Sequence, residues 1–275
     1  MSNVINTVTD KIVIRPCETF QELTACVDLQ IEVWGYSDGD VIPRRAFIVT
    51  QKIGGQVFGA FDVGLPGAAS NGDAGCLIGF AMALPGIRNG DGYLHSHMLA
   101  VRDAYRNRGI GRRLKLAQRA EALARNIQLM EWTFDPLEVK NAYLNIRRLG
   151  VIVRRYTPDF YGASSSRLQA GMPTDRLHAE WWMNSPRVNG ALSGNLPLTE
   201  VRETIGIPAE IAKWKKSSDL TQALAVQSKV REQFQSAFAN GMAAIGFEQD
   251  VEGNGIYQLG IAEVDVPHQG QTSLR

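Results

Sequence analysis

The stretch AVRDAYRNRGIGRRL, residues 100–114, joins a predicted strand to a predicted helix through a glycine turn. Gly109 and Gly111 provide the turn, and arginines crowd it at positions 106, 108, 112 and 113. The N-terminus of a helix already carries a partial positive charge of about half a unit, so cations there are unfavourable. Such a junction exposes unpaired backbone N–H groups, which together with the helix dipole bind anions. The stretch therefore predicts an anion, above all a phosphate group, at this turn.

Two nucleotide-binding motifs do not fit the turn. A P-loop requires Lys and then Ser or Thr after its second glycine, whereas Arg112 and Arg113 follow Gly111 here. The dinucleotide fingerprint requires a third glycine where Leu114 stands. The predicted phosphate therefore belongs to another kind of ligand.

Composition limits the classes of function. The chain has 275 residues, with 29 Lys and Arg against 28 Asp and Glu, a net charge of +1 that argues against general nucleic-acid binding. Its three scattered cysteines, Cys17, Cys26 and Cys76, favour a reducing compartment over a disulfide framework. No secretory signal opens the sequence, and no apolar run approaches the roughly 18 residues of a membrane span. We expect a cytoplasmic protein without membrane or nucleic-acid partners.

Hydrophobic patterning predicts an α/β chain with the element order β-α-α-β-β-β-α-β-α-β-β. The expected strands are 11–15, 56–63, 76–84, 91–101, 128–134, 151–156 and 175–183. The expected helices are 20–34, a short helix within 41–55, 110–127 with a stripe of Leu114, Leu116, Ala117, Ala120 and Leu123, and 136–149. Beyond Met183, the segment NSPRVNGALSGNLPL has the composition of a linker or long loop. A long helix capped by Asp219 and a hairpin around Gly253–Gly255 should follow, so we expect domains at 1–186 and 187–275.

The turn, with a strand before it and a helix after it, resembles the Q/R-x-x-G-x-G/A motif of the GNAT superfamily of acyl-CoA N-acyltransferases. Arg106, Gly109 and Gly111 occupy its defined positions, and the element order over 11–184 also resembles that fold. The resemblance implies a mixed, mostly antiparallel central sheet flanked by helices, here with a C-terminal helix and β-hairpin extension. It also implies coenzyme A bound through its pyrophosphate at the turn and its pantetheine arm along the preceding strand. The implied binding residues are Leu99, Ala100, Val101, Arg106, Asn107, Arg108, Gly109, Ile110, Gly111, Arg112, Asn141 and Asn145.

A histidine pair precedes the turn on the same predicted strand. His95 and His97 are two residues apart, which on a strand places both on one face, with Leu99 next along it. Acyl transfer requires a neutral amine, and histidine is suited to take its proton near neutral pH. The His-x-His-x-Leu-Ala-Val spacing resembles the arylalkylamine N-acetyltransferases of the superfamily, which implies a base or proton relay at His95 and His97.

Two other interpretations of the histidines stay open. They could be half of a metal site, but a catalytic zinc needs a third ligand, and the remaining candidates are His178, His268, Asp91 and Glu131. They could also be structural histidines without a chemical role. Glu131, on the predicted strand 128–134, is a further candidate for holding an amine or orienting a histidine, or an ordinary exposed strand residue.

The next helix departs from the superfamily pattern N-x-x-A-x-x-x-Y-x-x-x-G. With Gly150 and Ala142 in register, Val139 replaces the asparagine and Ile146 replaces the tyrosine that protonates the leaving thiolate. Tyr143 is the substitute acid available in the sequence, one helical turn earlier.

The expected function is transfer of an acyl group, acetyl first, from acyl-CoA to an amine that attacks directly, without a metal. The alternatives are a non-catalytic acyl-CoA-binding or regulatory module, in which the missing tyrosine reflects lost chemistry, and a structural protein that binds no CoA. The acceptor amine and a homodimer contact through the extension stay open.

Overall fold

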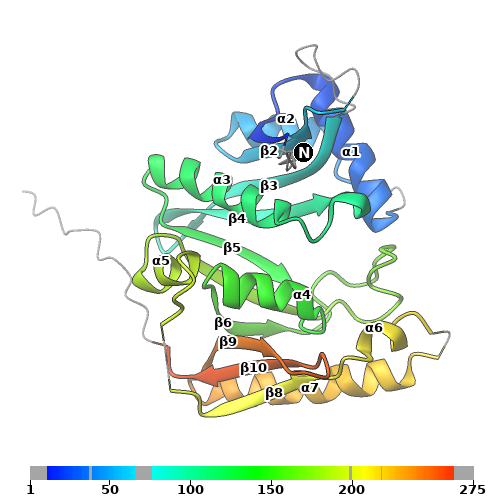
Figure 1. Cartoon of the computed structure of the whole chain (residues 1–275), viewed down its shortest axis with the longest axis vertical. Coiled ribbons are helices and arrows are strands. Elements are labelled where there is room, and N and C mark those ends of the chain that lie inside the picture. Colours follow the sequence, from blue (N-terminus) through cyan, green and yellow to red (C-terminus); the bar gives the residue numbers. More distant parts are fainter. Residues whose placement is uncertain (1–10, 37–38, 66–75, 198–199, 218, 263–275) are drawn as a thin grey trace, which may run out of the picture.

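The computed structural model describes residues 11–36, 39–65, 76–197, 200–217 and 219–262. Its strands form one ten-stranded sheet in the order β1-β2-β3-β4-β5-β7-β6-β9-β10-β8 (Figure 1). The pair β4–β5 is parallel and every other neighbouring pair is antiparallel. The predicted fold class, a mostly antiparallel mixed sheet flanked by helices with a C-terminal extension, is confirmed.

Most expected elements occur close to their predicted bounds. The strands are β1 Ile12–Pro16, β2 Gln56–Asp62, β3 Leu77–Arg88, β4 Asp91–Val101, β5 Leu129–Phe134, β6 Ile152–Thr157, β7 Arg176–Trp182, β8 Glu203–Ile207, β9 Ala243–Gln249 and β10 Gly255–Gly260. The helices are α1 Phe20–Trp34, α2 Arg44–Lys52, η2 Asp103–Tyr105, α3 Ile110–Ala124, α4 Val139–Ala142, η3 Tyr143–Arg148, α5 Pro186–Leu192, α6 Ile211–Trp214 and α7 Thr221–Ala239.

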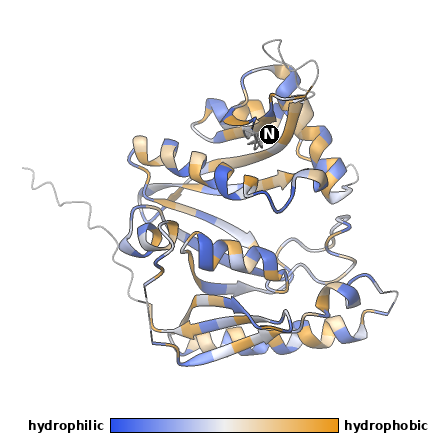
Figure 2. Cartoon of the chain, viewed as in Figure 1, coloured by the Kyte–Doolittle hydropathy of each residue, from blue (hydrophilic) through white to orange (hydrophobic). Residues whose placement is uncertain are grey.

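Helices cover the two faces of the sheet unequally. Apolar residues of α1 and α2 pack on one face of β2 and β3, whereas Ile110 and Leu114 of α3 pack on the other. The face under α3 continues beneath η3 and α7, whereas none of the described helices packs on the opposite face of β5, β7 and β6. Figure 2 shows hydrophobic residues along β2 and β3 and mixed residues along the helices.

The buried side of α3 differs from the predicted apolar stripe. Leu114 is buried as expected, but Ala120 is exposed, and the polar residues Lys115 and Gln118 are buried in its place. Both polar residues lie close to Leu114 on the helix surface, on the same side as Ile110 and Ala122. The sheet-facing side of α3 therefore includes a charged group inside the protein.

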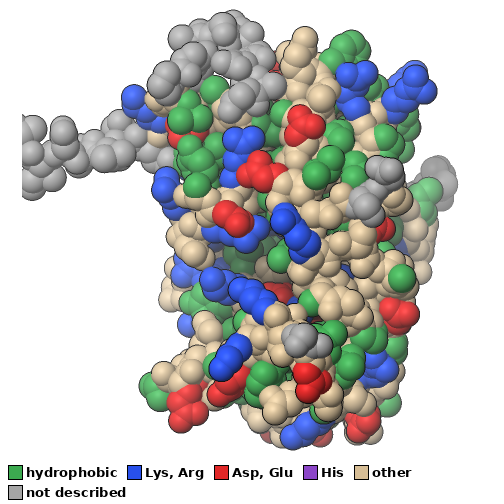
Figure 3. Space-filling model, turned by 90° about the vertical axis from the view of Figure 1, so that its right-hand side faces the viewer, with side chains coloured by type: hydrophobic (Ala, Val, Ile, Leu, Met, Phe, Trp, Pro, Cys, Tyr) green, Lys and Arg blue, Asp and Glu red, His purple; other side chains and the backbone are tan. Residues whose placement is uncertain are grey.

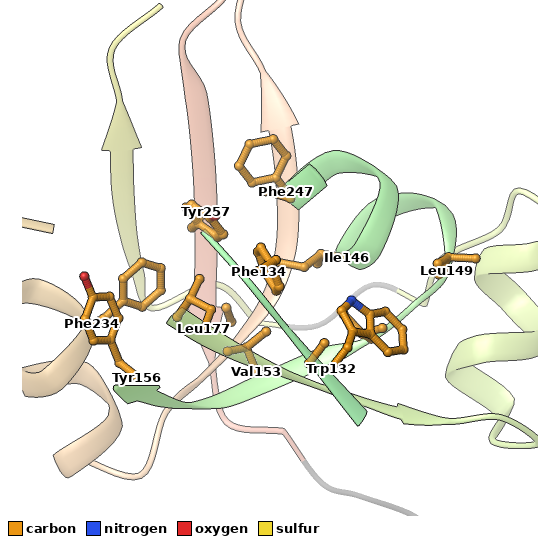
Figure 4. Close-up of a cluster of buried hydrophobic side chains, with 14 of the residues drawn as sticks. Trp132, Phe134, Ile146, Leu149, Val153, Tyr156, Leu177, Phe234, Phe247 and Tyr257 are labelled. Atoms are coloured by element: carbon orange, nitrogen blue, oxygen red, sulfur yellow. The ribbon is translucent and has the colours of Figure 1, made fainter. Parts of the chain in front are cut away.

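The C-terminal extension continues the sheet and shares its largest core. β9 joins β6 through the single pair Val153↔Ala244, and Phe234, Phe247 and Tyr257 pack among side chains of β5, β6, β7 and η3 (Figure 4). The segment predicted as a linker contains α5, because Ser185 accepts the Val188 N–H at 3.2 Å and caps a short helix. β8 and α6 have no counterpart in the prediction.

The helix predicted over 136–149 is shorter and changes type. α4 ends at Ala142 and continues as the π-helix η3, in which the Leu149 N–H donates to the Leu144 carbonyl at 3.0 Å. Within the described ranges, no helix is long and apolar enough to cross a membrane.

Candidate functional site

The two parallel strands at the centre of the sheet separate soon after they meet. β4 and β5 pair only at Leu94↔Met130 and His95↔Glu131, and the rest of β4 to Val101 has no partner on that side. The unpaired part, Ser96 to Val101, spans about 17 Å of extended chain. We call this space between the diverging strands the gap; its closed end is at His95 and its open end leads to the turn before α3.

A bulge interrupts β4 at one of the predicted catalytic residues. His97 is the residue of β4 that has no partner in the register with β3, because Met98 pairs with Met82 and Ser96 with Ala83. A bulge reverses the alternation of side chains along a strand. Leu99 therefore packs with Ile110 and Leu114 of α3, so the expectation that Leu99 shares a face with the histidines is wrong.

The turn at the open end of the gap presents free amides. The backbone N–H groups of residues 107–112 bond to no other group in the described part of the chain; the Arg113 N–H is the first to be paired, with Gly109 O at 3.0 Å. Asn107 and Gly109 have left-handed φ of 62° and 74°. Successive amides in such a conformation form a concave site for anions, which the helix dipole reinforces.

The arginines around the turn have different partners. Arg106 pairs with Asp103 at 2.7 Å, and Arg108 lies over the Tyr105 ring at 5.0 Å. Arg112 donates to the carbonyl of Leu192, the last residue of α5, at 3.1 Å, where a cation meets the negative end of a helix. Figure 3 shows Lys and Arg side chains across the middle of one face of the molecule, around a hollow.

The histidine rings lie close together and are partly buried. Their centroids are 6.3 Å apart, and neither ring forms a hydrogen bond with another described residue. Burial, followed by the nearby charges of His97, Lys115 and Arg155, lowers the pKa of His95 to about 4. Burial also lowers the pKa of His97. Both rings are therefore neutral at physiological pH and able to accept a proton.

A row of polar side chains extends from His95 across the face of the sheet opposite α3, because paired residues on neighbouring strands lie on the same face. We call Glu131, His178, Glu180 and Arg155 the polar face; His95 pairs with Glu131, and Glu131 with Glu180. Glu131 forms an ion pair with Arg88, and burial raises the pKa of its carboxyl group.

Both ring nitrogens of His178 form hydrogen bonds with neighbouring side chains. Arg155 Nη2 donates to Nδ1 at 2.8 Å, which leaves the proton on Nε2, 2.8 Å from Thr157 Oγ1. Both nitrogens are therefore occupied. Among the described residues, no three His, Cys, Asp or Glu side chains are placed to hold a metal ion. His268, considered above as a ligand, lies outside the described residues.

The predicted residues of α4 and η3 lie on the face under α3. Tyr143 and Asn141 are exposed there, whereas Asn145 is buried and its amide has no hydrogen-bond partner among the described residues. Ile146, at the tyrosine position of the pattern, is fully buried beside Phe134 (Figure 4). Nothing in this arrangement joins Tyr143 to the histidines, which lie on the opposite face of the sheet.

Sequence reasoning missed a group of three residues at the closed end of the gap. Lys115 Nζ lies 2.7 Å from Ser96 Oγ of β4 and 3.5 Å from the ring centroid of Trp132 on β5. The available signal was a lysine on the apolar side of α3, one residue after Leu114, where a charged residue is unusual.

The gap, the free amides and the helix behind them have the geometry of an anion-binding site at the open end of two diverging strands. Residues 41–143 match the sequence profile of the acetyltransferase (GNAT) family. These residues, which include the turn and the histidine pair, therefore have the sequence pattern of that family. A search among curated proteins found no relative of the chain.

Solved structures of low sequence identity are similar to part of the chain. NAA60 from Arabidopsis thaliana in complex with acetyl-CoA is 17% identical, with a TM-score of 0.51 over 63% of this chain and 99% of that chain. The ribosomal-protein-S18-alanine N-acetyltransferase from Escherichia coli is 15% identical, with a TM-score of 0.46 over 63% and 95%. The matches cover less than two thirds of this chain.

Proposed function

We propose that this protein transfers an acyl group, acetyl first, from acyl-CoA to an amine. The observation that carries the proposal is the row of free N–H groups at residues 107–112, at the open end of the gap. The pyrophosphate of CoA fits the amides of the turn, with Arg106, Arg108 and Arg112 near it. The pantetheine arm then lies in the gap beside Leu99, Ala100 and Val101, which β5 leaves unpaired.

The length and direction of the gap support a thioester at its closed end. The arm enters at the turn, and about 17 Å of β4 separates Val101 from Ser96. The acyl carbon would then approach His95 and His97, where the strands converge. Asn145 is buried on η3 and has no hydrogen-bond partner among the described residues, so we expect it to hydrogen-bond the arm; the exposed Asn141 is a weaker candidate.

Acyl transfer from this position needs a base and a stabilised oxyanion. The acceptor nitrogen attacks the thioester carbon, a neutral histidine of the pair takes the amine proton, and backbone N–H groups of β4 near Leu99 stabilise the developing oxyanion. Glu131 would help to place the amine, in competition with its ion pair to Arg88. Tyr143 is the candidate that the sequence offers for the acid that protonates the leaving thiolate.

The test has two parts. Calorimetry with CoA should detect binding, and a thiol reagent should detect free CoA released from acetyl-CoA in the presence of amines. The double variant His95→Gln/His97→Gln should bind CoA like the wild type but lose about 10²-fold to 10⁴-fold in kcat/KM. Full activity in this variant would overturn the histidine mechanism. CoA binding without thiol release by the wild type would favour the non-catalytic module, and no CoA binding would favour a structural protein.

A further inference from the structure

Lys115 is a charged residue inside the protein without a carboxylate partner. Its residue is 4% exposed, and no Asp or Glu among the described residues forms an ion pair with its ammonium group. The ammonium nitrogen lies 2.7 Å from the Ser96 hydroxyl oxygen and 3.5 Å from the centroid of the Trp132 ring. The second buried lysine, Lys215, by contrast, is neutralised by Asp135 and Glu138.

The position of Lys115 coincides with the point where the strands separate. The last paired residues are His95 and Glu131, and the next residue on each strand is a contact of Lys115: Ser96 on β4 and Trp132 on β5. Lys115 Nζ therefore lies between the two strands where their backbone pairing ends. A ligand that enters from the turn and follows the gap would reach this ammonium group with its far end.

Stability alone does not explain a lysine here. Burying an ammonium group without a counter-charge costs free energy, whereas an apolar side chain of similar length would pack against Trp132 without that cost. Nearby Gln118 Nε2 and Gln56 Oε1 are buried and have no hydrogen-bond partner in the described part of the chain, so the surroundings of Ser96 are polar and incompletely satisfied. Uncompensated polar groups of this kind are concentrated at functional sites.

We propose that Lys115 is the general acid that protonates the thiolate of CoA when the thioester breaks. This inference rests on the proposed acyl transfer. The acceptor nitrogen forms its bond to the acyl carbon, and the carbon–sulfur bond breaks with its electron pair on sulfur. The ammonium group of Lys115 gives a proton to that sulfur and becomes a neutral amine. The proton released by the acceptor nitrogen goes to a histidine on the opposite face, and solvent restores both groups after product release.

The acidities of the CoA thiol and of the Lys115 ammonium group support this assignment. A thiol has a pKa of about 8.5, and proton transfer is most effective when acid and acceptor have similar pKa values. Burial lowers the pKa of Lys115 well below its ordinary value, so its ammonium group gives up a proton more readily than that of an exposed lysine. Ser96 and Trp132 stabilise the charged form, through a hydrogen bond and a cation–π contact respectively. Ile146, meanwhile, contributes only packing at its buried position.

The experiment compares two leaving groups in the whole protein. The variant Lys115→Met keeps an unbranched side chain, one atom shorter, and removes the ammonium proton; Lys140→Met, on the exposed side of α4, is the matched control. Each is assayed with acetyl-CoA and with the selenium analogue of acetyl-CoA, whose selenolate leaves without needing protonation. We expect Lys115→Met to lose about 10²-fold or more in kcat/KM with the thioester and far less with the selenoester. Lys140→Met should match the wild type with both.

Equal losses of Lys115→Met with both substrates, or no loss, would overturn the role of Lys115. If that variant does not fold, Ser96→Ala, which removes the hydroxyl that positions the ammonium group, should show the same dependence on the leaving group to a smaller extent. A uniform effect of Ser96→Ala would then overturn the proposal. A wild-type protein that releases no thiol with any amine would overturn the acyl transfer itself, so the two failures are distinguishable.

Discussion

At the scale of single residues, the structure corrects how β4 presents its side chains. The alternation expected from the sequence holds up to Ser96 and reverses after His97, which has no partner on β3. Met98 and Ala100 then face α1 and α2, and Leu99 faces α3. The bulge at His97 keeps the two histidine rings close together, whereas from Met98 onward each side chain lies on the face opposite to the one that the alternation predicts.

The pKa of His95 gives a prediction about acid stability. A pKa of about 4 in the folded protein, against about 6.5 unfolded, means that only the unfolded chain binds this proton between those values. Stability from the neutral ring is therefore complete above pH 6.5 and decreases as the pH falls towards 4. NMR titration of the ring protons should show a midpoint near 4 for His95, and His95→Gln should lose less thermal stability between pH 7 and pH 5. A midpoint near 6.5 would contradict the burial of His95.

Gly109 allows a second test at this scale. Its φ of 74° is a conformation that costs other residues about 1 kcal/mol or more, although no atom lies within 4 Å of an added Cβ. Gly109→Ala should therefore lower the free energy of unfolding by about 1 kcal/mol and weaken CoA binding in calorimetry. Gly206→Ala, also with no atom within 4 Å but without a left-handed φ, is the control and should bind CoA normally. Unchanged affinity in Gly109→Ala would argue against the turn as the phosphate site.

At the scale of elements, the transition from α4 to the π-helix η3 changes which side chains face the core, so the spacing of the superfamily pattern does not predict their positions. A π-helix adds one residue to a turn and often occurs at functional sites. Ile146 therefore faces the core with Leu149, and Asn145 takes the position beside it. The departure from the superfamily pattern at this helix thus reflects a different helix type as well as a different residue.

Restoring a tyrosine at position 146 should not restore an acid. Ile146 is fully buried, so Ile146→Tyr must enlarge a packed core and place a hydroxyl there, at a cost of about 1–3 kcal/mol. Chemical denaturation should show this loss, and the rate of acyl transfer should not rise. Ile87→Tyr, at a residue that is 80% exposed, should leave stability unchanged. A faster Ile146→Tyr variant would show that the side chain at 146 reaches the thioester.

The elements that sequence reasoning predicted well are those set by local patterns. α1 has a capping box at Thr19 and Glu22 and a left-handed Gly35 at its end, and its predicted bounds match the structure. The bulge at His97, the π-helix and the contacts of Lys115 depend instead on partners far away in the sequence. β8 is five residues long with two buried positions, and its pairing with β10 could not be inferred from so short a pattern. The roles of the candidate site residues stay predictions for the experiments above.

At the scale of the whole molecule, the extension and the GNAT fold share one interior. Phe234 of α7 is fully buried and lies 5.8 Å from the ring of Tyr156 and 5.0 Å from that of Tyr257. Asp175, also fully buried, accepts hydrogen bonds from Nε and Nη2 of Arg231 on α7, each at 2.9 Å. The domain boundary at residue 186 stays a prediction, and the packing shows that the core on its two sides is continuous.

This continuity predicts that a change in the extension destabilises the whole protein. Phe234→Ala removes a buried aromatic ring and should lower the free energy of unfolding by about 3–5 kcal/mol, in one cooperative transition seen by both circular dichroism and tryptophan fluorescence. Leu224→Ala, on the same helix but 42% exposed, should cost much less. Two separate transitions in Phe234→Ala would show that the extension unfolds independently.

The shared interior also bears on how the protein is made. Two of the smaller apolar clusters draw only on residues 12–117, so both can pack while the ribosome is still adding the second half of the chain. The largest cluster includes Leu259, so it cannot close until nearly the last described residue has emerged. During synthesis, therefore, Trp132 and Trp181 stay exposed to solvent until late, and the middle of the sheet is an apolar surface to which chaperones can bind. Since Met130, Trp132 and Phe134 of β5 belong to this cluster, completion of the gap is tied to the end of translation.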